Sequence, residues 1–371
     1  MVSEPAIREA LIAVIDPEIR RSVVELGMVR AVDVRAAHVD VTIALTVPGC
    51  PMKADLESQV RRHVGAVEGV ESVGVSFDVM TPEQRTALRQ QLHGGTTPGQ
   101  QKTITIANRT RVVAIASGKG GVGKSTLTVN LAAALAAGGA EVGVVDADIY
   151  GYSVPRMLGI TRRPMVVDGM IVPPVNHGLK IMSIGFFLEP DQAVVWRGPM
   201  LHKALEQFLS DVHWGDLDYL LVDMPPGTGD VAISLGQLLP SPDVVIVTTP
   251  QAAAQQVAER SAEVAGKTGM HVAGVIENMS FVICPCCGER SHVFGQGGGR
   301  ALADRLEVPL LGEIPLDEPL RVASDAGRPL VLDDPDSASA RAIAEVADAL
   351  PGALRPRSGA ERIGRRLGVT G

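Results

Sequence analysis

The sequence predicts an α/β protein with a mostly parallel sheet covered by helices, preceded by a small α+β domain. From residue 111 onward, short and continuously apolar segments alternate with helical stretches, which is typical of parallel strands buried on both faces. Before residue 92 the pattern differs, because a strand of period two lies among short helices. Between these regions the segment Gly-Gly-Thr-Thr-Pro-Gly-Gln-Gln has no hydrophobic period. We therefore expect a first domain at 1–92, a linker at 93–110, a second domain at 111–350 and a basic tail at 351–371.

The first domain is expected to have the element order αββαβ. A helix is predicted over Glu4–Val14, and Val39–Leu45 alternates apolar and polar residues as a half-buried strand does. Arg30–Arg35 is the expected hairpin partner of that strand. A second helix follows Pro51, since proline fits the first helical turn. A third strand is marked by the alternation of Val73–Phe77.

The second domain carries the apolar strands of the predicted parallel sheet. These strands are Val112–Ala116, Val142–Val145, Tyr219–Val222, Val244–Val247, Val272–Ile276 and Leu310–Ile314. The last predicted helix spans Ala338–Leu350, and the tail after Pro351 carries five arginines against Glu361. Such a tail is typical of a solvated terminus. A membrane-surface helix is the less favoured interpretation, because its apolar side is thin.

Composition excludes several classes of protein. With 46% hydrophobic and 20% charged residues, the 371-residue chain is neither disordered nor fibrous. An aromatic content of 3% and a net charge of -8 argue against nucleic-acid binding. Four cysteines fit a reducing compartment in which free thiols are available as metal ligands. No segment approaches the roughly 18 apolar residues of a membrane span, so we expect a cytoplasmic protein that binds neither nucleic acid nor membrane.

The strongest motif is a glycine-rich loop between a predicted strand and a predicted helix. The segment Gly118–Thr126 matches the pattern G-x-x-x-x-G-K-[ST] in the required context. Glycines allow backbone N–H groups to close around phosphate oxygens, and the helix N-terminus favours negative charge. Lys124 is expected to neutralise the β- and γ-phosphates of ATP, and Ser125 is expected to bind Mg²⁺. The expected nucleotide-binding residues of this loop are Gly118, Lys119, Gly120, Gly121, Val122, Gly123, Lys124, Ser125 and Thr126.

Acidic residues follow two further predicted strands. Asp223 ends an apolar strand, where a carboxylate would hold Mg²⁺ directly or through water. The glycine-hinged loop 225–230 could then sense the γ-phosphate. Asp146 and Asp148 lie at the end of the second strand, and one of them could orient the attacking water. The alternative interpretation is an aspartate that caps the loop.

Lys119 is the unusual residue of the loop. A second lysine repels Lys124 unless phosphate is present, and an ordinary phosphate-binding loop does not need it. A second cation suggests stabilisation of transition-state charge in the manner of an arginine finger, delivered across a dimer.

These motifs resemble those of a known superfamily. With Lys119, the loop 118–126 resembles the deviant Walker A motif of the MinD/ParA/nitrogenase-iron-protein superfamily. A resemblance to the Mrp/ApbC iron–sulfur carrier ATPases covers nearly the whole chain, through the segments Asp146–Gly151, Asp223–Asp230, Glu277–Ser280 and Phe294–Gly299. The first domain is similar to a SufT-like iron–sulfur assembly domain, through the segments Asp16–Glu18, Leu26–Val29 and Pro48–Pro51.

The resemblance implies a homodimer in which Lys119 contacts the nucleotide of the partner. It also implies that Asp148 lies in the first switch, Asp230 lies in the second, and Asn278 and the backbone near Pro315 hold the adenine. The expected catalytic residues are Lys119, Lys124 and Asp148. One departure from the family pattern is Tyr152, which stands where proline is usual and touches no expected ligand.

The segment Cys284-Pro285-Cys286-Cys287 carries three of the four cysteines. A C-x-x-C motif is compatible with a zinc site, a redox pair or a cluster. A zinc site would need strained ligation by the three cysteines and His292, and a redox pair would be expected at a helix N-terminus rather than in a loop. Cys284 and Cys287 fit better as half of a [4Fe–4S] site shared by two subunits, and the family resemblance supports this pair.

Cys50 has two interpretations. It is either a small buried hydrophobe before a helix or, as the resemblance hints, a transient ligand of a cluster or a contact with a partner. Cys286 is interpreted as a bystander.

The predicted function is ATP-hydrolysing transfer of a labile iron–sulfur cluster. The expected cofactors are ATP and Mg²⁺ together with the cluster, and the expected partners are a cluster donor and apo-proteins that receive the cluster. The alternative is a MinD/ParA-type positioning or partition ATPase whose cysteine loop binds structural zinc or no metal. Cys284, Cys287 and the fused first domain argue against that alternative.

Overall fold

The structure is a computed structural model, and the chain in it divides into two compact units. The N-terminal unit takes in the described parts of residues 1–101, 164–173 and 211–213, and the C-terminal unit takes in the others. The residues described are 2–46, 52–92, 106, 109–148, 151–188, 198–227, 230–239 and 242–356, except the side chains of 198, 199 and 230.

The N-terminal unit contains the predicted order αββαβ, followed by a further helix. A three-stranded sheet of order β1-β2-β3 packs against helices, with β1 antiparallel and β3 parallel to β2. The elements are α1 (Glu4–Leu11), β1 (Val29–Arg35), β2 (His38–Leu45), α2 (Lys53–Gly65), β3 (Ser72–Val79) and α3 (Pro82–Leu92).

The core of this unit follows from the alternation in β2. Val39, Val41 and Ile43 are 0% exposed, and they lie on the face of the strand that meets the helices, as the period of two predicts. Helix α1 is shorter than predicted and ends at Leu11. The N–H groups of residues 12–14 bond three residues back, so the chain continues as tight turns instead of a helix.

A β-hairpin from the middle of the chain also belongs to the N-terminal unit. It consists of β6 (Met165–Val167) and β7 (Met170–Val172), which pair antiparallel. Val167, Met170 and Val172 are at most 1% exposed and share one hydrophobic cluster with the N-terminal sheet. At the turn of the hairpin, the carbonyl of Asp168 accepts a hydrogen bond of 2.7 Å from Arg89 of α3. Neither α3 nor this hairpin was predicted from the sequence.

The C-terminal unit is an eight-stranded sheet with helices on both faces. The strand order is β15-β12-β11-β4-β10-β5-β9-β8, and every pair is parallel except β8 and β9. Its strands are β4 (Arg111–Ser117), β5 (Val142–Asp146), β8 (Val175–Asn176), β9 (Leu179–Ser183), β10 (Tyr219–Asp223), β11 (Asp243–Thr248), β12 (His271–Glu277) and β15 (Leu310–Glu313), and a separate hairpin is formed by β13 (Val282–Ile283) and β14 (Arg290–Ser291). The predicted parallel α/β fold is therefore confirmed.

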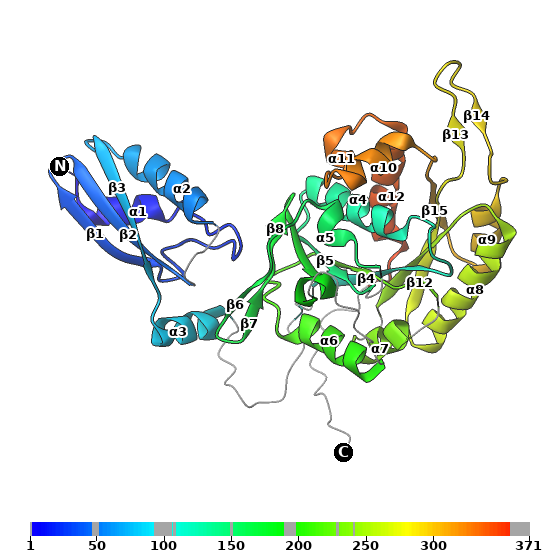
Figure 1. The fold of residues 1–371 in the computed structure, drawn as a ribbon, viewed down its shortest axis with the longest axis horizontal. Helices are drawn as coiled ribbons and strands as arrows, with labels where there is room; N and C mark the ends of the chain where they lie inside the picture. Colours follow the sequence, from blue (N-terminus) through cyan, green and yellow to red (C-terminus); the bar gives the residue numbers. More distant parts are fainter. Residues whose placement is uncertain are drawn as a thin grey trace. The chain divides into compact units, whose positions relative to one another are not determined.

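Helices of this unit form two layers (Figure 1). On one face α4 packs with α5, α10, α11 and α12, and on the other α6, α7 and α8 follow one another. The helices are α4 (Lys124–Ala137), α5 (Val154–Met157), a 3₁₀ helix (Ile184–Phe187), α6 (Gly198–Ser210), α7 (Asp230–Leu238), α8 (Ala252–Lys267), α9 (Gly298–Leu306), α10 (Glu318–Asp325), α11 (Leu330–Asp333) and α12 (Ala338–Ala353). The predicted last helix extends further than expected: it continues to Ala353, and Pro351 lies within its final turn instead of following its end.

The parallel order brings distant sequence motifs to one edge of the sheet. Asp223 ends β10 and lies in register with Asp146, which ends β5. The glycine-rich loop leaves the neighbouring strand β4, and Glu277 ends β12 at the same edge. The carboxyl edge of a parallel sheet is the usual place for a ligand site, so these residues form a candidate functional site.

Several predictions lie outside the described residues. They concern Cys50, most of the linker (93–105, 107 and 108) and the tail from residue 357 onward. Among the described helices, none combines the length and the hydropathy that crossing a bilayer requires.

We expect Met170→Ala to destabilise the N-terminal unit by about 2–5 kcal/mol, because this side chain is 1% exposed in the core of that unit. Val166→Ala is the matched control on the same hairpin. Its side chain is 54% exposed, so the change should stay within about 0.5 kcal/mol. Amide hydrogen exchange of β1–β3 measures the effect for this unit alone. Equal protection in the wild type and Met170→Ala would show that the hairpin does not support this core.

Candidate nucleotide site and cysteine hairpin

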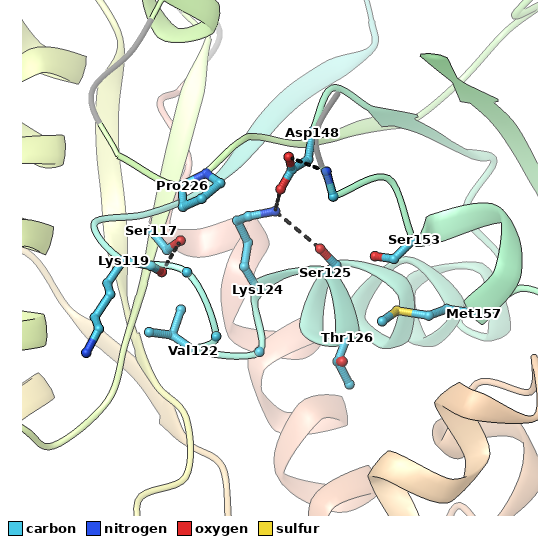
Figure 2. Close-up of a pocket in the computed structure, with 14 residues that line it drawn as sticks. Ser117, Lys119, Val122, Lys124, Ser125, Thr126, Asp148, Ser153, Met157 and Pro226 are labelled. Carbon is cyan, nitrogen blue, oxygen red and sulfur yellow. Dashed lines mark hydrogen bonds and ion pairs between the residues drawn. The ribbon is translucent and has the colours of Figure 1, made fainter. Parts of the chain in front are cut away.

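The glycine-rich loop connects β4 to α4 and lines a pocket of about 240 Å³. Two of its glycines are required by geometry. A Cβ on Gly118 would lie 2.2 Å from the backbone of Val257 in α8, and Gly123 has a φ of +82° where the loop enters the helix. Asp148, Ser153, Met157 and Pro226 complete the wall of the pocket beside the loop (Figure 2).

A buried carboxylate lies beneath the loop. Asp223 is 0% exposed, and its Oδ1 accepts hydrogen bonds from Nζ of Lys124 at 2.7 Å and from the hydroxyl of Thr128 at 2.9 Å. Its Oδ2 accepts a hydrogen bond of 2.6 Å from the hydroxyl of Ser125. Three donors from the loop and the first turns of α4 therefore compensate the buried charge.

The same residues fit a magnesium ion. A carboxylate oxygen and a serine hydroxyl oxygen, 2.6 Å apart, are hard ligands of the kind Mg²⁺ prefers. Ser125 lines the pocket together with the glycine-rich loop, and Asp223 is buried beneath that loop. Asp223 and Ser125, the two predicted magnesium ligands, are thus brought together by the fold.

Asp148 and Asp146 have different surroundings. Asp148 is 9% exposed on the wall of the pocket, and its carboxylate is 4.0 Å from Nζ of Lys124. Asp146 is 0% exposed beneath the pocket and accepts hydrogen bonds from the hydroxyl of Ser183 and from backbone N–H groups. Burial and the neighbouring charge of Asp223 raise the pKa of Asp146 to about 7.

The two lysines of the loop point in different directions. Figure 2 shows Lys124 directed into the pocket toward Asp148 and Ser125, whereas Lys119 extends away from them. Lys119 is exposed, and its carbonyl accepts a hydrogen bond of 3.1 Å from the hydroxyl of Ser117. Its ammonium group is therefore accessible from outside the chain.

Of the residues expected at the adenine, Asn278 contacts the glycine-rich loop. The side-chain amide of Asn278 donates a hydrogen bond of 2.8 Å to the carbonyl of Val122. Pro315 is buried and follows shortly after the end of β15 in the sequence. Asp230 is the first residue of α7, and its side chain lies outside the described residues.

The cysteine segment is the turn of a hairpin that stands out from the C-terminal unit (Figure 1). β13 and β14 pair at only two positions, and the N–H of Cys284 bonds the carbonyl of Glu289 across the turn at 2.9 Å. The thiols are free, with Cys284 half-buried and both Cys286 and Cys287 exposed. The backbone N–H groups of Cys286 and Cys287 lower the pKa of the Cys284 thiol from its usual value.

Within the part of the chain described here, no three His, Cys, Asp or Glu side chains are arranged to hold a metal ion. Cys284, Cys286, Cys287 and His292 therefore do not form a zinc site in one chain as it stands. The side chain of His292 instead has Nδ1 at 3.2 Å from the carbonyl of Ser280.

Three residues with a clear place in this region were not singled out from the sequence. Thr128 bonds Asp223, Ser183 bonds Asp146, and Glu277 bonds both Ser280 and the backbone of Gly299. Thr128 had a local signal, because it lies one helical turn after Lys124, and Glu277 begins a segment that carries the family resemblance.

A glycine-rich loop between a parallel strand and a helix, with a lysine, a serine and a facing strand-end aspartate, defines a P-loop nucleotide-binding protein. Residues 108–351 match the model of the ParA-type family described as NUBPL iron-transfer P-loop NTPase, and residues 4–77 match the model of the iron-sulfur cluster assembly protein family. The chain belongs to the NUBPL iron-transfer P-loop NTPase family. The resemblance predicted from the sequence is therefore confirmed, as is the P-loop NTPase fold.

Similar proteins cover nearly the whole chain. An iron-sulfur cluster carrier protein of Mycobacterium tuberculosis is 54% identical over 93% of this chain and 92% of its own length. The protein of that name in Synechocystis is 44% identical over 95% and 98%. Among solved structures, a nucleotide-binding protein of Archaeoglobus fulgidus in complex with ADP is 35% identical with a TM-score of 0.53, covering 70% of this chain and 95% of that one.

Asp146 should make stability depend on pH. Its pKa rises from 3.8 to about 7 on folding, so the folded state holds a proton that the unfolded state releases. The free energy of unfolding should therefore fall as pH rises from about 4 to about 7, by up to roughly 1.4 kcal/mol per pH unit, with no further contribution from Asp146 above that window. Urea unfolding of the nucleotide-free protein and of Asp146→Asn measures this. The free energy of unfolding should fall less steeply with pH in Asp146→Asn than in the wild type. Equal pH dependence in the two proteins would contradict the raised pKa of Asp146.

Proposed function

We propose that the protein is an ATP-hydrolysing carrier that binds a labile iron–sulfur cluster, of the [4Fe–4S] type, between two copies of the chain and transfers it to apo-proteins. The observation that carries the proposal is the pair of free thiols on a hairpin outside the nucleotide site, with Cys284 half-buried and Cys287 exposed. It is supported by relatives that are named iron-sulfur cluster carrier proteins. The cluster is the cargo of the protein and is not a resident cofactor.

Two copies are proposed because one chain offers too few ligands. A [4Fe–4S] cluster takes about four thiolates, and the hairpin presents the pair Cys284 and Cys287 with Cys286 beside it. Among the described residues, no His, Asp or Glu side chain joins these thiols as a further ligand. Four thiolates from two exposed hairpins would hold a cluster that is accessible to an acceptor, which suits transfer better than storage.

The nucleotide site is proposed to use the loop as other P-loops do. Backbone N–H groups of residues 118–126 bind the phosphates of ATP, and Ser125 and Asp223 hold the metal ion. When bound, Mg²⁺ supplies positive charge that neutralises the charge developing on the transferred phosphoryl group. Lys124 now pairs with Asp223, so its ammonium group exchanges a carboxylate for phosphate oxygens when ATP binds.

Three side chains are proposed to act around the γ-phosphate. Asp148 lies on the wall of the pocket and orients the attacking water. Asp230 belongs to the second switch. Lys119 points out of its own pocket, so it reaches the nucleotide of the partner and stabilises the transition state there. This arrangement makes hydrolysis depend on the dimer.

Further roles rest on the family alone. We propose that Asn278 and the backbone near Pro315 hold the adenine, and that 1–92 is an assembly domain joined by the linker 93–110 to the ATPase domain at 111–350, with a tail from 351. Cys50 as a transient ligand, a cluster donor and a cytoplasmic location remain predictions.

The first experiment is anaerobic reconstitution of the full-length protein with iron and sulfide, followed by analysis of both elements. About four irons and four sulfides per dimer are expected in the wild type and in Cys286→Ser, which is the matched control on the same turn. Both should be lost in Cys284→Ala/Cys287→Ala. Stoichiometric zinc in place of iron would make the hairpin structural and would favour a positioning ATPase, whose binding to lipid or DNA would then be measured by co-sedimentation.

Lys124→Ala should lower ATP hydrolysis by about 10²–10³-fold, because the charge facing the phosphates is lost. It should also abolish transfer of the cluster to an apo-ferredoxin.

Lys119→Ala should lower kcat by at least about 10³-fold and leave nucleotide affinity nearly unchanged, because its ammonium group lies outside its own pocket. Lys267→Ala, at a 78% exposed side chain on α8, is the control. Unchanged transfer by Lys124→Ala would remove ATP from the mechanism.

A further inference from the structure

Glu277 is a buried carboxylate to which the steps above give no role. It is the last residue of β12 and is 0% exposed. Its Oε1 accepts a hydrogen bond of 2.5 Å from the hydroxyl of Ser280, and its Oε2 accepts one from the backbone N–H of Gly299. A Cβ on Gly299 would lie 2.6 Å from Cβ of Glu277, so only glycine allows this approach. Both carboxylate oxygens are therefore committed to fixed donors.

These two donors lie on either side of the cysteine hairpin. Ser280 precedes it and Gly299, in the first turn of α9, follows it, so the chain at 281–298 leaves from and returns to the same carboxylate. Ser280 is held further by its N–H bond to the carbonyl of Ile314 at 2.9 Å. Because β13 and β14 pair at only two positions, the direction of the cysteine turn depends on how its base is held.

The next residue joins the same base to the nucleotide loop. Asn278 donates its side-chain amide to the carbonyl of Val122 at 2.8 Å and its backbone N–H to Thr248 at 2.9 Å. It contacts the loop so closely that a Cβ on Gly123 would lie 2.2 Å from its amide nitrogen. Met279, which follows, has a φ of +56°, a backbone conformation held by its surroundings. A displacement of the loop at Val122 must therefore move Asn278 or break this bond.

We propose that Glu277 is a positioning residue that transmits the state of the nucleotide loop to the cysteine hairpin. The loop at Val122 moves Asn278, the neighbouring Glu277 carboxylate moves with it, and both ends of the hairpin follow through Ser280 and Gly299. The inference rests on the proposed function, since it assigns a regulation to the same cysteine pair. The hydrogen bonds of Glu277 to Ser280 and Gly299 are the contact through which ATP would change the position of Cys284 and Cys287.

The test measures thiol reactivity in the cluster-free, full-length protein, so it does not depend on cargo. In a Cys50→Ser background, the rate of reaction of the hairpin thiols with dithiobis(nitrobenzoate) is compared without nucleotide and at saturating MgATP. We expect the two rates to differ by about fivefold or more, the lower end of ordinary coupling between sites. Equilibrium dialysis of ATP confirms saturation in each variant.

The variants separate positioning from general stability. Glu277→Ala removes the hydrogen bonds to Ser280 and Gly299, so the thiol reaction rates with and without MgATP should differ by less than about twofold. Ser280→Ala removes one of these bonds, so the ratio of the two rates should be smaller than in the wild type. Glu277→Gln keeps the shape and both bonds, because an amide oxygen can accept from Gly299 and an amide N–H can donate to the serine oxygen. It should keep the ratio of the wild type. Asp243→Asn, at a buried carboxylate that begins β11, is the matched control and should also keep it.

Two outcomes overturn the inference. One is a wild-type protein whose thiols react at the same rate with and without saturating MgATP. The other is the full ratio in Glu277→Ala or, should that variant not fold, in Ser280→Ala. Failure of the proposed function has a different signature, because a protein that binds no iron on reconstitution would still show the nucleotide-dependent ratio if Glu277 acts as inferred.

Discussion

The nucleotide site depends on the hydrogen bonds that the buried carboxylate of Asp223 accepts. An unpaired charge at a fully buried position is costly, and here Lys124, Ser125 and Thr128 together compensate it. The loop is therefore held against the end of β10 before any nucleotide arrives. The neighbouring Asp146 has a raised pKa because burial disfavours its charged form and because the nearby charge of Asp223 disfavours a second negative charge. The position of Lys124 therefore depends on the negative charge beneath the loop and on any anion that occupies the pocket.

Sheet topology determines which residues can share this edge. In the order β12-β11-β4-β10-β5, the loop leaves the central strand β4, and Asp223, the proposed magnesium ligand, ends the strand beside it. Glu277 ends β12 and Asn278 follows it, two strands away on the other side, and the side chain of Asn278 spans that interval to reach Val122. A parallel sheet makes this possible because all its strands end at one edge. The cysteine hairpin is thereby attached to the nucleotide edge, although its tip stands outside it.

Local signals in the sequence predicted the parallel strands, the loop and the strand-end aspartates, because each depends on residues adjacent in the chain. Features that depend on distant partners were not predicted. Strand β9 contains Lys180, a residue type expected at the surface, and it is buried because its ammonium group donates to the carbonyl of Trp214. The hairpin of β6 and β7 packs in a core formed by residues far earlier in the chain. The role of Glu277 depends on the backbone of Gly299, which no period or motif connects to it.

A carrier faces two opposing physical requirements. The cargo ligands must be exposed for an acceptor to approach, yet they must also respond to a nucleotide bound elsewhere. A short hairpin satisfies the first requirement, since only two residue pairs join its strands. The second can be met only at its base, where buried hydrogen bonds have few alternative partners and so resist independent motion. Because Glu277 and Asn278 are adjacent, with one side chain on the hairpin base and the other on the nucleotide loop, neither contact can change without affecting the other.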